Sequence, residues 1–146
     1  MFLSFRGEDT RRGFTDYLYK QLDWRGIRTF RDDPDLRRGA DISPELLTAI
    51  EQSRFAIIVL STNYATSSWC LRELTHIVQS MKEKERIFPI FYDVDPSDVR
   101  HQRGSFGTAL INHERNCGED REEVLEWRNA LKKVANLAGW NSKDYR

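Results

Sequence analysis

Residues 55–60 (FAIIVL) constrain the fold more than any other part of the chain. The run is continuously apolar and β-branched in its middle, a pattern typical of a strand that is covered on both faces. Residues 87–92 form a second run of this kind, in which Pro89 argues against a fully central position. Residues 1–5 and 27–30 are expected to be further, shorter strands. Strands of this type favour a parallel sheet with helices on both faces.

Helical patterns alternate with these strands through short links. Thr10 can cap the first helix and Gly26 can end it, and Ser43-Pro44 supplies a cap followed by proline at the first helical position. A fifth strand, if present, is expected to be short and to lie around 99–103. The alternation predicts an α/β sheet with right-handed crossovers, in which ligands collect at the carboxyl ends of the strands. Helices are expected from Thr10 to about Arg25, from Pro44, from near Ser68, over 105–116 and over 122–138.

The composition excludes several classes of protein. The chain has 146 residues with 23 basic and 23 acidic side chains, so we expect one globular domain. A net charge of zero argues against nucleic-acid binding through bulk positive charge. A mean hydropathy of −0.67, without an apolar run of about 18 residues, argues against a membrane span. Two cysteines, Cys70 and Cys117, indicate a reducing compartment rather than a disulfide scaffold. Because the chain opens directly on a strand, we expect residues 1–146 to be one domain excised from a larger protein.

The motifs of several familiar chemistries do not occur in the sequence. There is no GxxxxGK[ST] or GxGxxG loop for phosphates and no GxSxG serine elbow. The third strand ends in Ser-Thr-Asn at 61–63, without the aspartate that a phosphoryl-accepting response regulator needs. The three histidines, His76, His101 and His113, lie far apart with no ligand at metal-binding spacing, so no metal site is expected.

One group of residues has the spacing of a site. Trp69 and Glu73 are four residues apart in the expected third helix, so they share a face near its start. An indole beside a carboxylate can form a stacking wall and a partly desolvated anion. The plainer alternative is a solvated glutamate next to a core tryptophan, and the pattern alone favours it. Residues 6–9 are either a salt-bridged turn or a phosphate-facing rim, and the charged loop 32–42 is by default solvated.

Four segments resemble the motifs of plant Toll/interleukin-1 receptor (TIR) domains. They are residues 2–11 (FLSFRGEDTR), 61–65 (STNYA), 68–74 (SWCLREL) and 89–100 (PIFYDVDPSDVR). The likeness is greatest to the N-terminal module of plant nucleotide-binding, leucine-rich-repeat immune receptors. It implies a flavodoxin-like three-layer α/β sandwich whose five-stranded parallel sheet has the order 2-1-3-4-5. It also implies self-association, cleavage of NAD+ or NADP+, cell-death signalling, and a place in the cytoplasm or nucleus.

The resemblance assigns roles to individual residues. The catalytic glutamate of the family corresponds to Glu73. Because Glu73 is expected at the rim of the sheet, its replacement by alanine is expected to leave the fold intact. The loop 32–42 corresponds to the segment that moves on assembly. The substrate-contacting residues of the family correspond to Arg6, Gly7, Ser67 and Trp69.

The resemblance also implies two self-association surfaces. In the first helix, Asp16-Tyr17 replaces the Ser-His pair that is common in the family, so a carboxylate is expected to meet its own copy and to weaken the dimer. The second surface involves Gly139, and Gly139→Arg is expected to block it without unfolding the domain. We therefore expect a chain that associates weakly with itself or with other TIR domains.

Three functions follow as alternatives. The first is cleavage of the nicotinamide–ribose bond of NAD+ or NADP+ with no added cofactor or metal, giving ADP-ribose or a cyclic isomer. The second is a non-enzymatic adaptor that acts through homotypic contacts. The third is formation of 2′,3′-cyclic nucleotides from nucleic acid, tied in some relatives to the cysteine that corresponds to Cys70. The zero net charge disfavours this third function.

Overall fold

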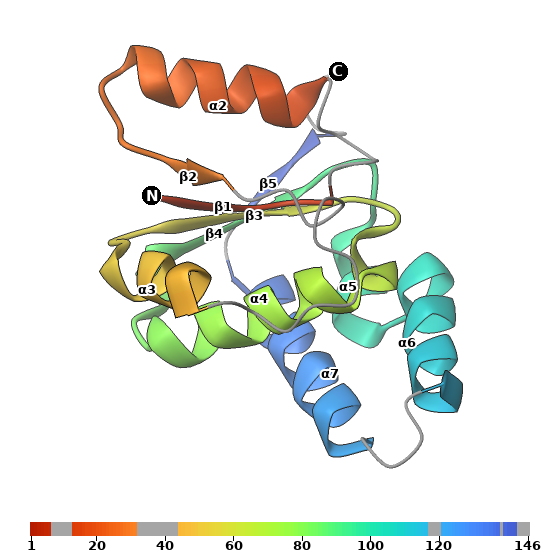
Figure 1. Ribbon diagram of the computed structural model, residues 1–146. Coiled ribbons are helices and arrows are strands. Elements are labelled where there is room, and N and C mark those ends of the chain that lie inside the picture. Colours follow the sequence, from red (N-terminus) through yellow and green to blue (C-terminus); the bar gives the residue numbers. More distant parts are fainter. Residues whose placement is uncertain (7–12, 32–43, 117–120, 138, 143–146) are drawn as a thin grey trace.

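Five parallel strands form one sheet in the order β2-β1-β3-β4-β5. The computed structural model describes residues 1–6, 13–31, 44–116, 121–137 and 139–142 (Figure 1). The predicted fold class and strand order are both confirmed. The strands are β1 (Phe2–Ser4), β2 (Phe30–Arg31), β3 (Ala56–Leu60), β4 (Ile87–Phe91) and β5 (Trp140–Asn141). The helices are α2 (Phe14–Trp24), α3 (Pro44–Gln52), α4 (Ser68–Ser80), α5 (Pro96–His101), α6 (Gly104–Asn116) and α7 (Arg121–Ala135), with short 3₁₀ turns η2 (Tyr64–Thr66) and η3 (Lys84–Arg86).

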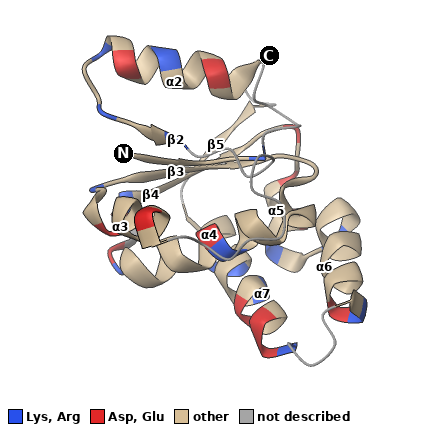
Figure 2. Cartoon of the chain, in the orientation of Figure 1, with Lys and Arg blue, Asp and Glu red and all other residues tan. Residues whose placement is uncertain are grey.

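Strand β3 is the centre of the sheet. It pairs with β1, where Leu3 lies opposite Ile57, and with β4, where Ile57 lies opposite Phe88. All of its residues are buried, as the continuous apolar run predicted. Figure 2 shows β3 and β4 without charged side chains, while the charges gather on the helices. None of the helices among the described residues is long and apolar enough to cross a bilayer.

The helices are shared unequally between the two faces of the sheet. Among the described residues, α2 is the one helix on one face, and α3 to α7 cover the other (Figure 1). Because successive side chains of a strand point to opposite faces, the three inner strands β1, β3 and β4 each contribute to both cores. The larger core lies under α3 to α7 and includes Phe2, Ile58, Leu71, Phe106 and Leu131. The smaller core lies under α2 and consists of Leu3, Phe5, Ile57, Val59 and Ile90.

The end of helix α2 follows the predicted glycine signal. Gly26 has a φ of 76°, its amide donates to Asp23 O, and the Ile27 amide donates to Leu22 O. These two bonds form a Schellman motif, which needs a residue with positive φ after the helix. Because Ile27 still serves the helix end, strand β2 starts only at Phe30, and the predicted strand over 27–30 was placed too early.

The expected position of the fifth strand is wrong. Residues 99–103 fall in helix α5 and the turn after it, not in a strand. Asp95 caps this helix by accepting from the Ser97 amide at 2.9 Å, and Pro96 occupies its first turn. The fifth strand is β5, whose two residues pair with Ile90 and Phe91 of β4. A strand of two residues has no periodicity from which the sequence could predict it.

Pro89 fits within β4 because of the direction in which it faces. The Tyr92 amide donates to Leu60 O of β3 at 3.0 Å. Since successive residues of a strand face alternate neighbours, Pro89 faces β5 instead. The pairing of β5 begins only with Trp140, opposite Ile90, so no strand residue requires the amide that proline lacks. The expectation that β4 is not fully central is confirmed.

Candidate active site

A serine cap starts helix α4 shortly after the carboxyl end of β3. The Ser67 hydroxyl accepts a hydrogen bond from the Cys70 amide at 3.2 Å, and the Ser67 backbone is extended. The bond satisfies one of the amides that a helix leaves unpaired in its first turn. The predicted helix start near Ser68 is confirmed, and the first turns of α4 carry both Trp69 and Glu73.

The Glu73 carboxylate is buried, with an exposed fraction of 1%. Ser4 Oγ donates to Oε1 at 2.8 Å, and Trp69 Nε1 donates to Oε2 at 3.2 Å. The plainer interpretation, a solvated glutamate, is therefore wrong. The reason is tertiary, because the sheet brings Ser4 of β1 against the inner side of α4. A buried carboxylate is tolerated when charge-assisted hydrogen bonds replace its water, so the expectation that Glu73→Ala spares the fold loses its basis.

Tyr64 extends this group of polar atoms into the core. Its hydroxyl lies 2.8 Å from Ser4 Oγ and donates to the carbonyl oxygen of Cys70 at 3.1 Å. Burial raises the pKa of Tyr64 well above its ordinary value, and the neighbouring Cys70 and Glu73 add to the rise. Neither Ser4 nor Tyr64 is among the site residues predicted from the sequence. The available signal was a serine between two phenylalanines in an otherwise apolar strand, Phe2–Ser4 continuing into Phe5.

The other predicted site residues lie close to the same end of the sheet or outside the described residues. Cys70 is buried, and its thiol donates to Phe5 O at 3.4 Å. Arg6 is half-buried and follows Phe5 at the carboxyl end of β1. Gly7 and the loop 32–42 lie outside the described residues. Among the described residues, no three His, Cys, Asp or Glu side chains lie together where they could hold a metal ion.

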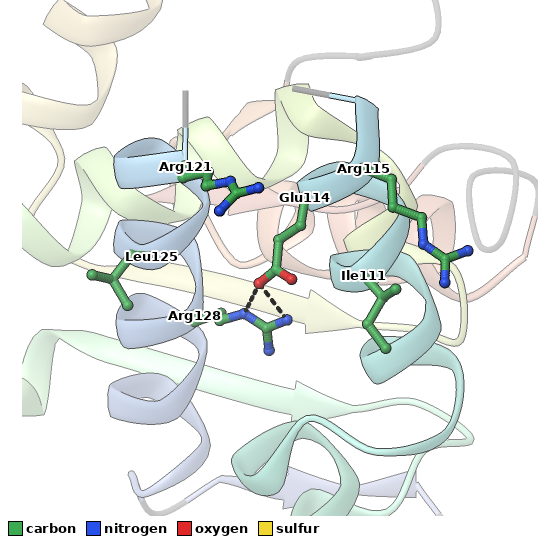
Figure 3. A pocket seen from close by; sticks show the side chains of 6 residues that line it. All are labelled: Ile111, Glu114, Arg115, Arg121, Leu125 and Arg128. Carbon is green, nitrogen blue, oxygen red and sulfur yellow. Dashed lines mark hydrogen bonds and ion pairs between the residues drawn. The ribbon is translucent and has the colours of Figure 1, made fainter. Parts of the chain in front are cut away.

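A hollow of about 630 Å³ lies between α6 and α7, and it does not belong to this site. In Figure 3 Arg128 of α7 reaches across it to Glu114 of α6, and the two form an ion pair at 2.7 Å. Its lining mixes charges and exposed aliphatic groups and includes none of the residues around Glu73. The lining residues are Ile111, Glu114, Arg115, Arg121, Leu125 and Arg128.

An apolar hollow of about 480 Å³ lies on the other face of the sheet, beside α2. It brings together Tyr17 and Gly139, which the sequence analysis assigned to separate surfaces. The other lining residues come from α2 and from β3, β4 and β5, so the hollow is the part of this face that α2 leaves uncovered. They are Phe14, Leu18, Ile57, Phe88, Pro89, Ile90 and Trp140.

Gly139 stands against the backbone of β4. A Cβ atom at this position would lie 2.5 Å from Pro89 O and 2.7 Å from Pro89 Cγ. Contacts this short force the neighbouring backbone to move. The expectation that Gly139→Arg acts on a surface without disturbing the fold is therefore wrong, because any side chain here pushes β5 away from β4.

Asp16 is already paired within its own chain. Its carboxylate lies 3.0 Å from Lys20 Nζ and 3.4 Å from Arg31 Nη1. The hydrogen bond from Lys20, with a smaller contribution from Arg31, holds the pKa of Asp16 below its usual range. Two neighbouring cations offset the negative charge, so the expected repulsion between two copies of Asp16 is weaker than the sequence predicted. Tyr17 beside it is 63% exposed.

The family model of the TIR domain matches residues 1–146. The chain belongs to the TIR domain family. Its sequence is 56% identical to the disease resistance protein RPV1 of Vitis rotundifolia over 147 residues, which cover 100% of this chain and 10% of that protein. It is 54% identical to the TMV resistance protein N of Nicotiana glutinosa, over 95% of this chain and 12% of that protein. This TIR domain therefore spans about a tenth of the length of these curated plant relatives.

A solved structure extends the likeness to three dimensions. The TIR domains in the structure of the activated Roq1 resistosome, which directly recognises the pathogen effector XopQ, match this TIR domain with a TM-score of 0.86 and 50% identity. The match covers 99% of this chain and 87% of that one. The fold and the family of the chain thus agree between sequence and structure.

Proposed function

We propose that this TIR domain cleaves NAD+ or NADP+ at the nicotinamide–ribose bond and signals within a plant immune receptor. The observation that carries the proposal is the Glu73 carboxylate, buried near the carboxyl end of a parallel sheet and bonded on both oxygens by Ser4 and Trp69. Ligands of such sheets collect at this end. Membership of the TIR family supports the assignment.

Cleavage of the nicotinamide–ribose bond requires one fixed anion from the protein. Nicotinamide leaves as a neutral base with the electrons of the broken bond, so no general acid is needed to protonate it, unlike the leaving group of a two-carboxylate glycosidase. The ribose left behind has the character of an oxocarbenium cation. A carboxylate held in place before the reaction stabilises that charge without having to reorganise. Water that captures the ribose gives ADP-ribose, and capture by the substrate's own base gives a cyclic isomer.

The remaining site residues would hold the substrate. We assign phosphate contacts to the Arg6 guanidinium and to Gly7, the next residue in the sequence, and sugar or base contacts to Ser67 and Trp69. The Ser67 hydroxyl uses one acceptor position for the Cys70 amide and keeps its hydrogen for a ligand. The reaction as proposed needs neither a cofactor nor a metal, and a role for Cys70 stays secondary to that of Glu73.

Assembly is the second part of the proposal. The resistosome of Roq1 contains TIR domains of the same fold, and we propose that copies of this chain associate through the α2 face, where Tyr17 borders an apolar hollow. The chain would act as one domain of a larger cytoplasmic or nuclear receptor. Specific activity is then expected to rise with protein concentration, in step with the mass seen by light scattering. A constant specific activity from a monomer would refute the requirement for assembly.

Nicotinamide release from NAD+ tests the enzymatic part. Glu73→Gln keeps the size of the side chain and removes its charge, and we expect a loss of at least ~100-fold in turnover, as for other single electrostatic groups. Arg128→Gln in the α6–α7 hollow is the control, since it removes a charge remote from the site, and it should retain turnover. Equal turnover by Glu73→Gln and the unmodified chain would assign the domain to the non-enzymatic adaptors.

A further inference from the structure

The buried hydroxyl groups of Ser4 and Tyr64 form a short chain of hydrogen-bonded oxygen atoms, the hydroxyl chain, that ends on Glu73. Ser4 Oγ lies 2.8 Å from Glu73 Oε1 and 2.8 Å from Tyr64 Oη, and Tyr64 Oη lies 3.1 Å from the carbonyl oxygen of Cys70. Ser4 and Tyr64 are both fully buried. They come from different elements, β1 and η2, while Glu73 and Cys70 belong to α4. The three elements are thus joined through one row of oxygen atoms.

The hydrogens available decide the direction of this row. When Glu73 is ionised, the row holds only the hydroxyl hydrogens of Ser4 and Tyr64, one each. The Ser4 hydrogen goes to Glu73, so the 2.8 Å contact between Ser4 and Tyr64 is a hydrogen bond only if Tyr64 donates to Ser4. The Cys70 carbonyl is the alternative acceptor for that same hydrogen.

Protonation of Glu73 reverses the direction in which the hydrogen bonds of this row are donated. The carboxyl group then donates to Ser4, Ser4 donates to Tyr64, and Tyr64 donates to the Cys70 carbonyl. In this state all three contacts are hydrogen bonds, because the carboxyl group adds its hydrogen to those of the Ser4 and Tyr64 hydroxyls. The same oxygen positions therefore serve both charge states, and no heavy atom has to move when Glu73 gains or loses a proton.

We propose that Ser4 and Tyr64 are positioning residues, which hold the Glu73 carboxylate in its working orientation through a hydroxyl chain whose direction follows the charge on Glu73. This inference rests on the proposed function, because the orientation matters for the reaction assigned to Glu73. Trp69 fixes one carboxylate oxygen and the hydroxyl chain fixes the other. Donation from Tyr64 makes Ser4 a stronger donor, since hydrogen bonds in a row polarise one another.

Several ionisable groups near the two hydroxyls are engaged elsewhere. Arg72, next to Glu73 in sequence, pairs with Glu123 of α7 at 2.8 Å, and His113 of α6 bonds to Ala65 O at 2.8 Å. The Cys70 thiol donates to a backbone carbonyl. Cys70 and Glu73 are the titratable groups that act electrostatically on Tyr64.

The Trp69 indole provides a test that does not require activity. Its N–H donates to Glu73 Oε2, so its ¹⁵N–¹H resonance follows the charge on Glu73 as the pH is changed. The resonance is assigned by its loss in Trp69→Phe. Removing a donor from the ionised carboxylate favours the protonated form, so the midpoint of the titration should move to higher pH in Ser4→Ala and, by a smaller amount, in Tyr64→Phe.

The same variants are compared in NAD+ cleavage. We expect kcat to fall by ~10-fold or more in Ser4→Ala, which loses a bond to a charged group, and by ~5-fold in Tyr64→Phe, which loses a neutral bond one step away. KM should stay within about twofold of its original value if neither residue contacts the substrate. Tyr19→Phe is the matched control, because it removes a phenol hydroxyl on α2, on the opposite face of the sheet, and should change neither readout.

The outcomes separate this inference from the proposed function. If Glu73→Gln abolishes cleavage while Ser4→Ala and Tyr64→Phe retain kcat, the positioning role is wrong and the enzymatic function stands. An indole resonance and a kcat that are both unchanged in Tyr64→Phe would also overturn it. If no variant and not even the unmodified chain cleaves NAD+, the proposed function fails. A shifted indole midpoint would then still establish that the hydroxyl chain supports the charge of Glu73.

Discussion

The two faces of the sheet differ in how completely helices cover them. The face under α3 to α7, the closed face, is covered by several helices, and three of the side chains buried there, Ser4, Tyr64 and Glu73, are linked by hydrogen bonds. The face under α2 is closed by one helix only, and it leaves Phe88 and Trp140 about 40% exposed beside an apolar hollow. Neighbouring residues of the same strands supply both faces. Under the proposed function, the closed face holds the site, and the open face offers a surface for contact.

The strongest test of this contrast is to remove the carboxylate from the closed face. Glu73→Ala removes the acceptor of the Trp69 indole and opens a cavity, while the Ser4 hydroxyl can turn its hydrogen to Tyr64. We expect a loss of ~2–4 kcal/mol in unfolding free energy besides the loss of turnover. Urea unfolding measures it, with Glu73→Gln as the comparison that keeps the volume. A stability equal to that of the unmodified chain would show that the buried bonds contribute nothing to the fold.

Gly139 tests the edge of the open face. In Gly139→Ala the new methyl group meets Pro89 O, and we expect a destabilisation of ~1–3 kcal/mol through displacement of β5. Gly139→Ala and the unmodified chain are compared by thermal unfolding. If Gly139→Ala proves as stable as the unmodified chain, the tight contact with β4 is not present in solution.

The pH dependence of stability reports on the closed face at the alkaline end. The pKa of Tyr64 is raised in the folded chain by burial, so the tyrosine stays neutral there while it ionises in the unfolded chain above about pH 10. The contribution of neutral Tyr64 to the unfolding free energy is fully present below that pH. It is lost as the pH rises above it, by up to ~1.4 kcal/mol per pH unit. Tyr64→Phe should therefore flatten the decline in unfolding free energy between about pH 10 and 11. An identical decline in both proteins would contradict the buried position of the hydroxyl.

Phe88 tests the open face itself. Phe88→Ser removes an aromatic ring that is 45% exposed at the apolar hollow. We expect a stability change of about 1 kcal/mol or less, since much of the ring is already in water, but weaker self-association. Sedimentation or light scattering over a range of concentrations measures the second effect. Unaltered association would remove the α2 face from the proposed assembly.

The smallest effect is expected at Asp16, on the outer side of α2. The pKa of the Asp16 carboxylate is lowered by Lys20 and Arg31. The contribution of this ion pairing to folding stability is therefore present above about pH 4 and is lost as the pH falls further. Asp16→Asn should make the unfolding midpoint slightly less sensitive to acid. High salt should reduce the difference, because both partners are in contact with solvent. A difference that persists in salt would mean that the pair is shielded.

The sequence predicted what depends on local patterns. The strand over 56–60, the serine cap before α4 and the glycine that ends α2 all involve residues close together in the chain. The family resemblance adds Glu73 as the predicted catalytic residue, and that role stays a prediction. The burial of that carboxylate was not predictable, because it depends on Ser4, whose position beside α4 is set by the sheet.

The two failures have different origins. Residues 99–103 look like a strand by elimination, but Asp95 and Pro96 give the segment a helix start, a local signal that the prediction did not use. Gly139 looks like a surface position, and only the register of β5 against β4 reveals that Pro89 occupies the space of its missing side chain. The second case depends on a contact between segments that are far apart in the chain.

The brevity of the outer strands limits how this sheet can grow. In the described residues β2 and β5 each pair through two residues with their neighbours. A long, regular outer strand would present a row of unpaired backbone groups, to which another chain could add and so extend the sheet into a fibril. Two residues offer too short a template for such addition. The short outer strands therefore disfavour aggregation by strand addition. Under the proposed assembly, several copies of the domain would associate reversibly through side-chain contacts of limited area.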